Sequence, residues 1–251
     1  MIDKTEIKRK INSELDKAEK IWNDVKGEFL VKSVRAFAAL NESVEPSNIP
    51  GFPFIKNGEG KVGNFSAMIL DIRNSTKHLL EAYSNKKNVS QLQRVLYETT
   101  AINTLGLICV NEQNGAITEF LGDGFLALFE TEEPEAVYKV RDCAEKCLEY
   151  TKDVINPILK ERYDLPDINI GIGIAYSKAI VTLIGMEDEL HPKAIGECIY
   201  RASKLSKGNN EILYDEKIKL YWPSSKGGKL SFIERYHRNE KDTKGFITLY
   251  K

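Results

Sequence analysis

Histidine and cysteine are scarce in this chain of 251 residues, which holds three of the first and four of the second. Cys143 and Cys147 are four positions apart on an expected helix, a spacing that differs from that of a CxxC metal pair. A structural zinc site of Cys and His ligands is therefore not expected. The four thiols are instead expected to be reduced, as in a cytoplasmic protein.

The sequence also lacks a long apolar run and an excess of either charge. No stretch reaches the ~18 apolar residues of a membrane-spanning helix, and the charged N-terminus does not resemble a signal peptide. Lys and Arg number 36 against 37 Asp and Glu, whereas nucleic-acid binders are usually clearly basic. With 42% hydrophobic residues, the chain is expected to be a globular cytoplasmic protein that binds neither membrane nor nucleic acid.

The first 60 residues predict a helical extension and a linker that precede one domain over 61–251. Apolar residues recur at helical spacing over 4–40, but they drift from a strict heptad, so packing on the domain is favoured over a coiled coil. Residues 41–54 contain three prolines and predict a connector, and the polar, Gly-rich segment 56–63 predicts a loop.

From residue 65 the hydrophobic pattern predicts strands and helices in the order β-α-α-β-β-α-β-β-α-β-α-β-β. Helices are expected from about Asn74, over 90–112, over 134–161 and over 196–208. Strands are expected at 65–72, 116–121 and 125–129, in 168–185 as a hairpin turning near Ser177-Lys178, and in three short segments after 210. The front half contains βαββαβ, so the predicted class is α+β with a ferredoxin-like core.

Two acids predict a metal site. Asp71 ends the apolar strand FSAMILDI, and Asp123 lies at the tip of a Gly-Asp-Gly turn. In a βαββαβ fold these points can converge at one edge of the sheet, where two carboxylates are hard oxygen ligands for Mg²⁺ or Mn²⁺. Each acid alone is an ordinary helix cap or turn residue, but the two together favour a metal site. Gly122 and Gly124 are expected to take positive φ at the turn.

The residues after the first of these acids are expected to bind a triphosphate. They lead into a predicted helix, whose free N–H groups and dipole favour an anion. Ser75 and Thr76 add hydroxyl donors, and Asn74 is a candidate cap. Arg73 is either close to the substrate or a solvated surface residue.

Five motifs in order resemble the class III nucleotide cyclases, the family of adenylate and guanylate cyclase catalytic domains. They are FSAMILDIRNSTKHL and ITEFLGDGFLALF for the two metal motifs, INIGIGIAYSKAIVTLIG for the next strand pair, AIGECIYRASKLSK for a late helix and KGFITLYK for the closing strand. The likeness covers residues 64–251. It implies the cyclase extension of the βαββαβ core and a homodimer with active sites at its interface.

The resemblance also implies the chemistry. Two Mn²⁺ or Mg²⁺ ions per site would lie on Asp71, the Ile72 carbonyl and Asp123. The ribose 3′-hydroxyl of a nucleoside triphosphate would attack the α-phosphorus and expel pyrophosphate. Two positions depart from the pattern: Tyr200 aligns with the usual transition-state Asn and Lys204 with the usual Arg. Both are catalytic candidates.

The base-reading positions depart as well. Glu119 stands where the family has Lys for adenine or Glu for guanine, and Lys193 stands where it has Asp or Thr for adenine or Cys for guanine. An acid and an ammonium either present acceptor and donors to a base or pair with each other. This altered pocket resembles the uridylate-type pyrimidine cyclases of bacterial anti-phage defence (Pycsar), which implies UTP first and CTP next. The cyclic UMP or cyclic CMP product would activate a separate effector.

Other residues leave alternatives open. Lys241 and Lys244 precede the last strand, where the family often has a phosphate-binding Lys; an exposed solubilising Lys is the alternative. Asn169 aligns with a position that is often Arg. The competing functions are an adenylate or guanylate cyclase with an unusual pocket, and a nucleotide-binding module that has lost turnover. A palm polymerase or diguanylate cyclase is disfavoured, because no GGDEF-like signature is present.

Overall fold

The structure is a computed structural model of the chain, and it describes residues 20, 23, 24, 44–80, 89–186, 189–223, 228–236 and 244–250. The helix predicted over 4–40 lies almost entirely outside these residues, and so does Lys241. Contacts divide the chain into two compact units, one of residues 1–63 with 178–196, the other of 64–177 with 197–251. The predicted domain boundary after residue 60 stays a prediction.

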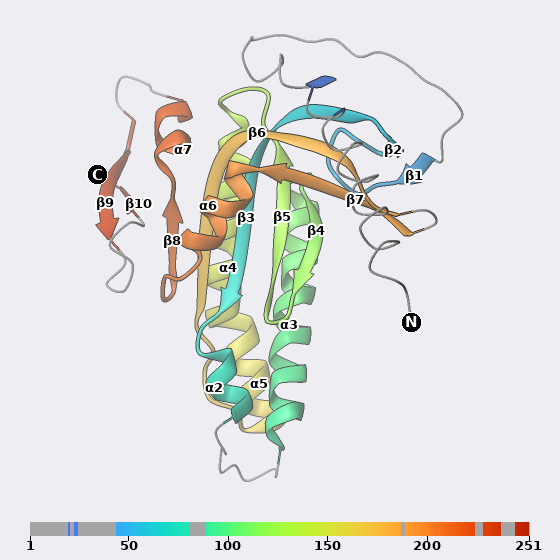
Figure 1. Cartoon of the computed structure of the whole chain (residues 1–251). Coiled ribbons are helices and arrows are strands. Elements are labelled where there is room, and N and C mark those ends of the chain that lie inside the picture. The colour runs from blue at the N-terminus through green and yellow to red at the C-terminus, as the bar shows by residue number, and fades with distance from the viewer. Residues whose placement is uncertain are drawn as a thin grey trace. The chain divides into compact units, whose positions relative to one another are not determined.

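A mixed sheet organises the second unit. Its strands run in the spatial order β4 (Ala116–Leu121), β5 (Gly124–Glu130), β3 (Gly60–Ile72), β6 (Ile170–Met186), β8 (Glu211–Tyr214), β10 (Lys244–Tyr250) and β9 (Leu230–Tyr236). The first core strand, β3, pairs antiparallel with β5, and β6 pairs parallel with β8 (Figure 1). The predicted α+β class is confirmed.

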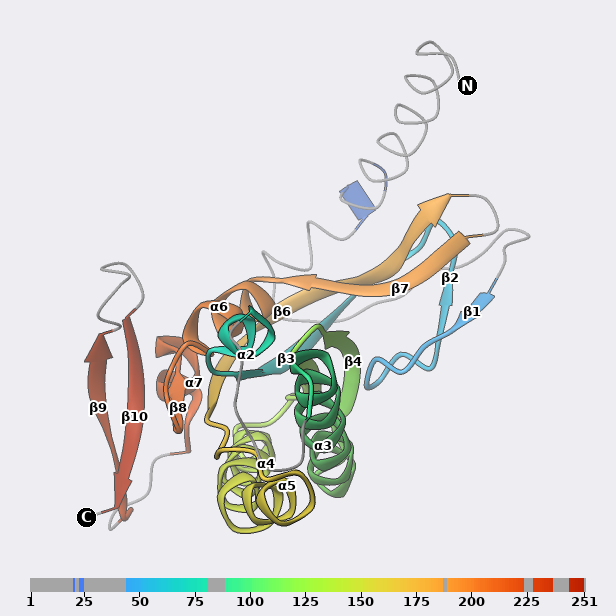
Figure 2. The same cartoon turned by 90° about the horizontal axis from the view of Figure 1, so that it is seen from below.

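Helices cover both faces of this sheet. They are α2 (Ser75–Leu80), α3 (Gln91–Glu112), α4 (Ala136–Tyr150), a π-helical turn (Thr151–Ile155), α5 (Asn156–Tyr163), α6 (Glu197–Leu205) and α7 (Glu216–Tyr221). Figure 2 shows α3, α4 and α5 on one side of the sheet and α6 on the other. The helix predicted over 134–161 is present as α4, the π turn and α5 in succession. Among the described residues, no helix has the length and hydrophobicity needed to cross a bilayer.

The core lies between the sheet and α3 and α4. Alternate residues of the central strands point toward these helices and are fully buried, among them Met68, Leu70 and Ile172. The helix α3 comes close to β5 because Gly106 has no side chain: a Cβ there would lie 2.2 Å from the Phe125 ring. A Ser90 capping box, with Gln93 as its second member, fixes the start of α3.

The opposite face of the sheet holds α6 in very close contact. A Cβ on Gly171 would lie 2.1 Å from the Ser206 carbonyl oxygen, and one on Gly173 would lie 2.0 Å from the Ala202 carbonyl oxygen. Only glycine allows the helix backbone to come so near the strand. The buried side chains of α6, such as that of Cys198, turn toward β6, which places other helix positions on the outer side.

The first unit contains two short strands that the sequence analysis missed. β1 (Val44–Pro46) and β2 (Phe54–Lys56) form an antiparallel pair within the region predicted as a connector, and β3 already begins within the predicted loop. In the same unit β6 pairs with β7 (Glu189–Gly196). The hydroxyl of Thr182 on β6 donates to the Glu59 carbonyl oxygen at 2.8 Å.

The hairpin predicted inside 168–185 is wrong. β6 runs through this tract as one strand of 17 residues, and its antiparallel partner is β7. Ser177 does not form a turn: its side chain is buried, and its hydroxyl oxygen accepts a hydrogen bond from the Cys198 N–H at 2.8 Å. Ser177, which resembled a turn residue in the sequence, therefore bonds to the first turn of α6.

A buried acid at the start of α7 predicts a pH-dependent stability. Asp215 Oδ1 accepts from the Ile218 N–H at 2.8 Å, and burial raises the pKa of this acid from 3.8 to about 6. The folded state then holds the proton more tightly than the unfolded chain, so the free energy of unfolding falls as pH rises from about 4 to about 6, by roughly 2 kcal/mol.

An Asp215→Asn variant keeps the capping oxygen and removes the titration. We expect its unfolding free energy, measured by urea denaturation between pH 4 and 7, to lose about 2 kcal/mol less over this range than that of the unmodified protein. The slope that remains comes from other acids. An unchanged slope would show that Asp215 does not titrate as inferred.

Candidate functional site

The two predicted acids meet at one end of the β3–β5 pair. Asp71 is the register partner of Gly124, so the last residues of β3 lie beside the turn that carries Asp123. The Ile72 N–H donates to the Asp123 carbonyl oxygen at 3.1 Å, which ties the turn to the strand. The convergence that the sequence predicted is therefore present, through backbone pairing on rigid strands.

The glycines of this turn differ from expectation, because neither Gly122 nor Gly124 has a positive φ. Gly124 is instead required by space: a Cβ there would lie 1.9 Å from the Leu70 carbonyl oxygen. Gly122 has no atom within 4 Å of such a Cβ. The close approach of two strands, and not the turn conformation, explains the second glycine.

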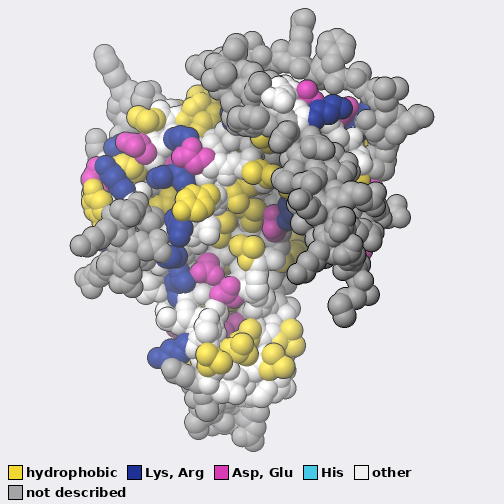
Figure 3. All heavy atoms as spheres, in the orientation of Figure 1, with side chains coloured by type: hydrophobic (Ala, Val, Ile, Leu, Met, Phe, Trp, Pro, Cys, Tyr) yellow, Lys and Arg dark blue, Asp and Glu magenta, His cyan; other side chains and the backbone are white. Residues whose placement is uncertain are grey.

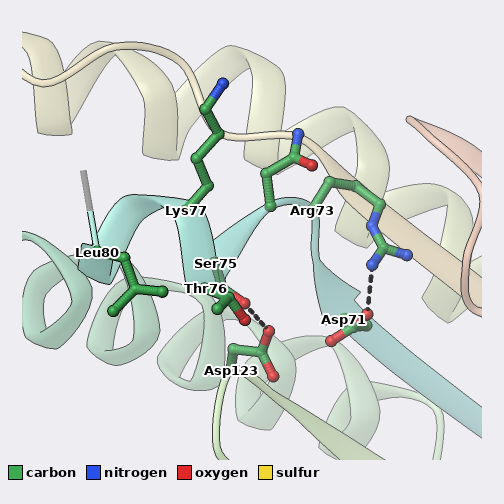
Figure 4. Close-up of a pocket in the computed structure, with 8 residues that line it drawn as sticks. Asp71, Arg73, Ser75, Thr76, Lys77, Leu80 and Asp123 are labelled. Carbon is green, nitrogen blue, oxygen red and sulfur yellow. Dashed lines mark hydrogen bonds and ion pairs between the residues drawn. The ribbon is translucent and has the colours of Figure 1, made fainter.

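The loop after β3 bends back over the carboxylates through a left-handed residue. Asn74 has φ of +61°, a conformation that Asn tolerates better than most residues. The bend brings Ser75 to Asp123, where the serine hydroxyl donates to Oδ2 (Figure 4). The predicted helix then begins as α2, whose described residues are Ser75–Leu80.

Arg73 lies against the first acid. Its guanidinium contacts Asp71 Oδ2 at 2.8 Å (Figure 4). It also donates to the Ser206 carbonyl oxygen at 3.1 Å, just beyond the end of α6. Its backbone N–H donates to the Asn169 carbonyl oxygen at 2.8 Å. The side chain predicted for the triphosphate is therefore held on a carboxylate, and Asn169 acts here through its main chain.

The two carboxylates raise the proton affinity of the site. Burial first, and then the nearby charge of Asp123, raise the pKa of Asp71 from 3.8 to about 6. The Arg73 guanidinium and the more distant Lys207 act in the opposite direction. A cation between the two acids would relieve the part of this shift that comes from the charge of Asp123.

A pocket of about 730 Å³ opens over the two acids, a size typical of small-molecule sites. The described residues that line it are Asp71, Arg73, Asn74, Ser75, Thr76, Lys77, Leu80 and Asp123. Lys77 and Leu80 were not singled out in the sequence. Their three-residue spacing on the predicted helix could have shown that they share a face. Figure 4 shows the Lys77 side chain extending away from the carboxylates.

The donor set of this pocket suits a hard divalent cation. The two carboxylates offer oxygen donors, and Mg²⁺ commonly takes only one or two carboxylates and fills the remaining positions with water and substrate phosphates. Ile72, whose carbonyl is the third predicted ligand, is not among the described lining residues, so its role stays a prediction. Within the described part of the chain, no cluster of three or more His, Cys, Asp and Glu side chains could hold a metal. The residues thus fit an ion that a bound phosphate helps to hold.

The predicted catalytic pair lies on the outer side of α6. Tyr200 is 66% exposed, and the Lys204 ammonium lies 5.8 Å from the centre of its ring. The described lining residues of the carboxylate pocket include neither of them. Their orientation follows from the glycines of β6, which hold the other side of the helix on the sheet.

A β-bulge places Glu119 on the same face as the first acid. The pairing of β4 with β5 shifts between Ile117 and Glu119, so that Glu119 lies opposite Leu126. Leu126 also pairs with Ile69, two residues before Asp71. Because paired antiparallel residues share a face, Glu119 and Asp71 project from the same side of the sheet.

The other two predicted ligand-binding residues lie elsewhere. Lys193 is on β7 opposite Thr182, in the first unit, whereas Glu119 belongs to the second. Lys244 begins β10, where its ammonium contacts Glu234 Oε1 at 2.6 Å. The roles of these two lysines stay predictions.

No family model matches the sequence, and no curated protein matches it. Solved structures do. The guanylyl cyclase Cya2 aligns with a TM-score of 0.60 and 16% identity over 75% of this chain and 92% of its own. The adenylyl cyclase CyaB from P. aeruginosa aligns with a TM-score of 0.60 and 15% identity over 76% of this chain and 94% of its own. The guanylate cyclase domain of RhGC from Catenaria anguillulae, in complex with GTP, aligns with a TM-score of 0.54 and 16% identity over 75% of this chain and 96% of its own. The chain therefore has the fold of class III nucleotide cyclase catalytic domains.

Proposed function

We propose that the protein is a nucleotide cyclase that converts a pyrimidine nucleoside triphosphate, UTP before CTP, to the 3′,5′-cyclic monophosphate and pyrophosphate. One observation carries the proposal: Asp71 and Asp123 converge under a pocket of about 730 Å³ in a fold shared with adenylyl and guanylyl cyclases. In the reaction the ribose 3′-oxygen bonds to the α-phosphorus, the bond to the bridging oxygen of pyrophosphate breaks, and the hydroxyl proton is lost.

Different residues at this site would bind the metal ions, orient a ligand and bind phosphate. Asp71, Asp123 and the Ile72 carbonyl would hold two Mn²⁺ or Mg²⁺ ions, which supply positive charge to the triphosphate. The Ser75 hydroxyl fixes the orientation of Asp123. Thr76 lines the same pocket and offers a hydroxyl to phosphate oxygens.

Further positive charge for the phosphates lies at the outer part of the pocket. Lys77 lines the pocket, whereas Lys244 is not among the described lining residues and contacts Glu234 on the neighbouring strand β9. We therefore favour Lys77 over Lys244 as the lysine that contacts the phosphates. Arg73 becomes a phosphate ligand only when a cation displaces it from Asp71.

The choice of a pyrimidine rests on the base-reading positions. Glu119 shares a face with the metal-binding acid, and a Glu/Lys pair with Lys193 matches neither the adenine nor the guanine pattern of the resembling family. A carboxylate accepts hydrogen bonds and an ammonium donates them, which suits a base edge that carries both donors and acceptors. The role in anti-phage defence, through a cyclic UMP or cyclic CMP effector, rests on the resemblance to the uridylate-type cyclases alone.

A homodimer would complete the site. Tyr200 and Lys204 project from the outer side of α6. In the proposed homodimer they would enter the carboxylate pocket of the second copy. Lys204 would supply positive charge at the transition state as a point charge, without the two-pronged geometry of Arg. Tyr200 would donate one hydrogen bond in place of the usual amide.

Incubation with each of the four nucleoside triphosphates and Mn²⁺ tests the proposal. We expect a cyclic product from UTP, a smaller amount from CTP, and little from ATP or GTP, as measured by mass spectrometry of the products. A product from ATP or GTP alone would overturn the pyrimidine assignment. Nucleotide binding without any product would identify a module that has lost turnover.

A further inference from the structure

A group of three polar side chains, built around a buried acid, lies outside the pocket and joins α2 to α3. Glu98 of α3 is 1% exposed, and its Oε1 accepts from the Arg94 Nε–H at 2.8 Å. Its other oxygen, Oε2, lies 2.8 Å from His78 Nδ1 on α2. Because the carboxylate accepts, Nδ1 carries the hydrogen in this contact. Both oxygens of a buried acid therefore have a partner, one from each helix.

The described part of α2, Ser75–Leu80, has no buried side chain of its own, and its two leucines, Leu79 and Leu80, are 43% and 72% exposed. Apolar packing by these residues therefore contributes little to the position of the helix. Polar contacts link it to its surroundings: Ser75 donates to Asp123, His78 contacts Glu98, and the Gln91 amide donates to the Leu80 carbonyl oxygen at 3.5 Å.

Ser75 and His78 lie at opposite ends of one helical turn. They are three residues apart, so the helix transmits the position of one to the other. Glu98 cannot relax into solvent, because leaving a buried carboxylate without partners is costly. The contact between His78 and Glu98 thus fixes the position of α2, and the position of α2 determines where the Ser75 hydroxyl lies.

We propose that His78 is a positioning residue for the carboxylate pocket. By holding α2 on the buried Glu98–Arg94 pair, it keeps the Ser75 hydroxyl where it orients Asp123 for a divalent cation. His78 is not a catalytic residue, because it is outside the described lining of the pocket. The role rests on the proposed function, since the cation bound at the two acids is what gains from the fixed geometry.

The test is the affinity for Mn²⁺ alone, followed by electron paramagnetic resonance of the free ion. We expect His78→Leu to weaken Mn²⁺ binding about tenfold, the usual size of a lost outer-shell contact. His78→Asn should restore most of the affinity, because the Asn amide nitrogen occupies the place of Nδ1. Leu79→Ala, a change at the next position of the same helix, should bind as the unmodified protein does.

Kinetics give a second readout. In His78→Leu the Mn²⁺ concentration for half-maximal cyclisation should rise about tenfold, while the rate at saturating Mn²⁺ stays within about twofold. A purely structural role would instead lower the melting temperature and the rate and leave the Mn²⁺ dependence unchanged. If His78→Leu does not fold, His78→Ala, which leaves Glu98 with Arg94, takes its place in both measurements.

The possible results separate the two proposals. Unchanged Mn²⁺ affinity in the His78 variants, with tight binding by the unmodified protein, would overturn the positioning role and leave the cyclase proposal intact. Mn²⁺ binding that depends on His78 in a protein without cyclase activity would support the positioning role and reject the proposed function. No Mn²⁺ binding by the unmodified protein would reject both.

Discussion

Replacing Asp123 by alanine is expected to lower cyclisation about 1000-fold while the protein stays folded. The change removes one of two carboxylates that would hold the divalent ions, and metal contributions of several kcal/mol correspond to such a factor. The side chain is partly exposed, and its loss relieves the repulsion that raises the pKa of Asp71. Product formation from UTP at saturating Mn²⁺, together with a melting temperature, checks both parts of the expectation.

A matched control is Asp167→Ala, which removes an exposed acid in the loop before β6 and should leave the rate unchanged.

The Asp123→Ala variant also tests the proposed homodimer. Mixing Asp123→Ala with Lys204→Ala, each inactive by itself, should restore about a quarter of the activity, because half of the dimers are mixed and each mixed dimer has one intact site of two. Turnover retained by Asp123→Ala would remove this residue from the metal site, and a mixture without activity would exclude sites shared between subunits.

Replacing Gly124 by alanine is expected to destabilise the fold by about 1–3 kcal/mol and to reduce Mn²⁺ binding strongly. The added Cβ would lie 1.9 Å from the Leu70 carbonyl oxygen, and neither backbone can move without separating β3 from β5. Because Asp71 pairs with Gly124, any shift at this point also moves the first acid away from the second. Urea denaturation and Mn²⁺ titration measure the two effects.

The neighbouring glycine provides the control for this variant. Gly122→Ala makes the same chemical change two residues earlier in the same turn, where a Cβ meets no atom within 4 Å and φ is not positive. We expect its stability to lie within about 0.5 kcal/mol of the unmodified protein. Equal effects of the two substitutions would mean that the turn, and not the strand contact, makes Gly124 necessary.

The sequence predicted the acid pair because its signals are local. An apolar strand that ends in an acid and a Gly-Asp-Gly turn between two strands are each complete within about ten residues. The pairing of Asp71 beside this turn then followed from the βαββαβ order. The helices over 90–112 and 134–161 were predicted for the same reason, since their periodic patterns are long.

Features that depend on distant parts of the chain could not be predicted. Alternation along β4 would place Ile117 and Glu119 on one face, and only the bulge at Thr118 separates them. The hydroxyl of Ser177 marks a helix start 21 residues later in the chain, which a Ser-Lys pair does not indicate. The contact between His78 and Glu98 needs the packing of α2 on α3.

The ion pair between Arg73 and Asp71 places a cationic group of the protein at the proposed metal site. The guanidinium lies 2.8 Å from the carboxylate, so a metal ion bound there would replace one cation by another and would not join a bare anionic site. The net free energy of metal binding would be the difference between the metal–carboxylate and guanidinium–carboxylate interactions, which favours ions of higher charge over monovalent ones. The displaced guanidinium would keep its hydrogen bond to the Ser206 carbonyl oxygen beyond the end of α6, and its charge would stay at the mouth of the pocket for the proposed triphosphate.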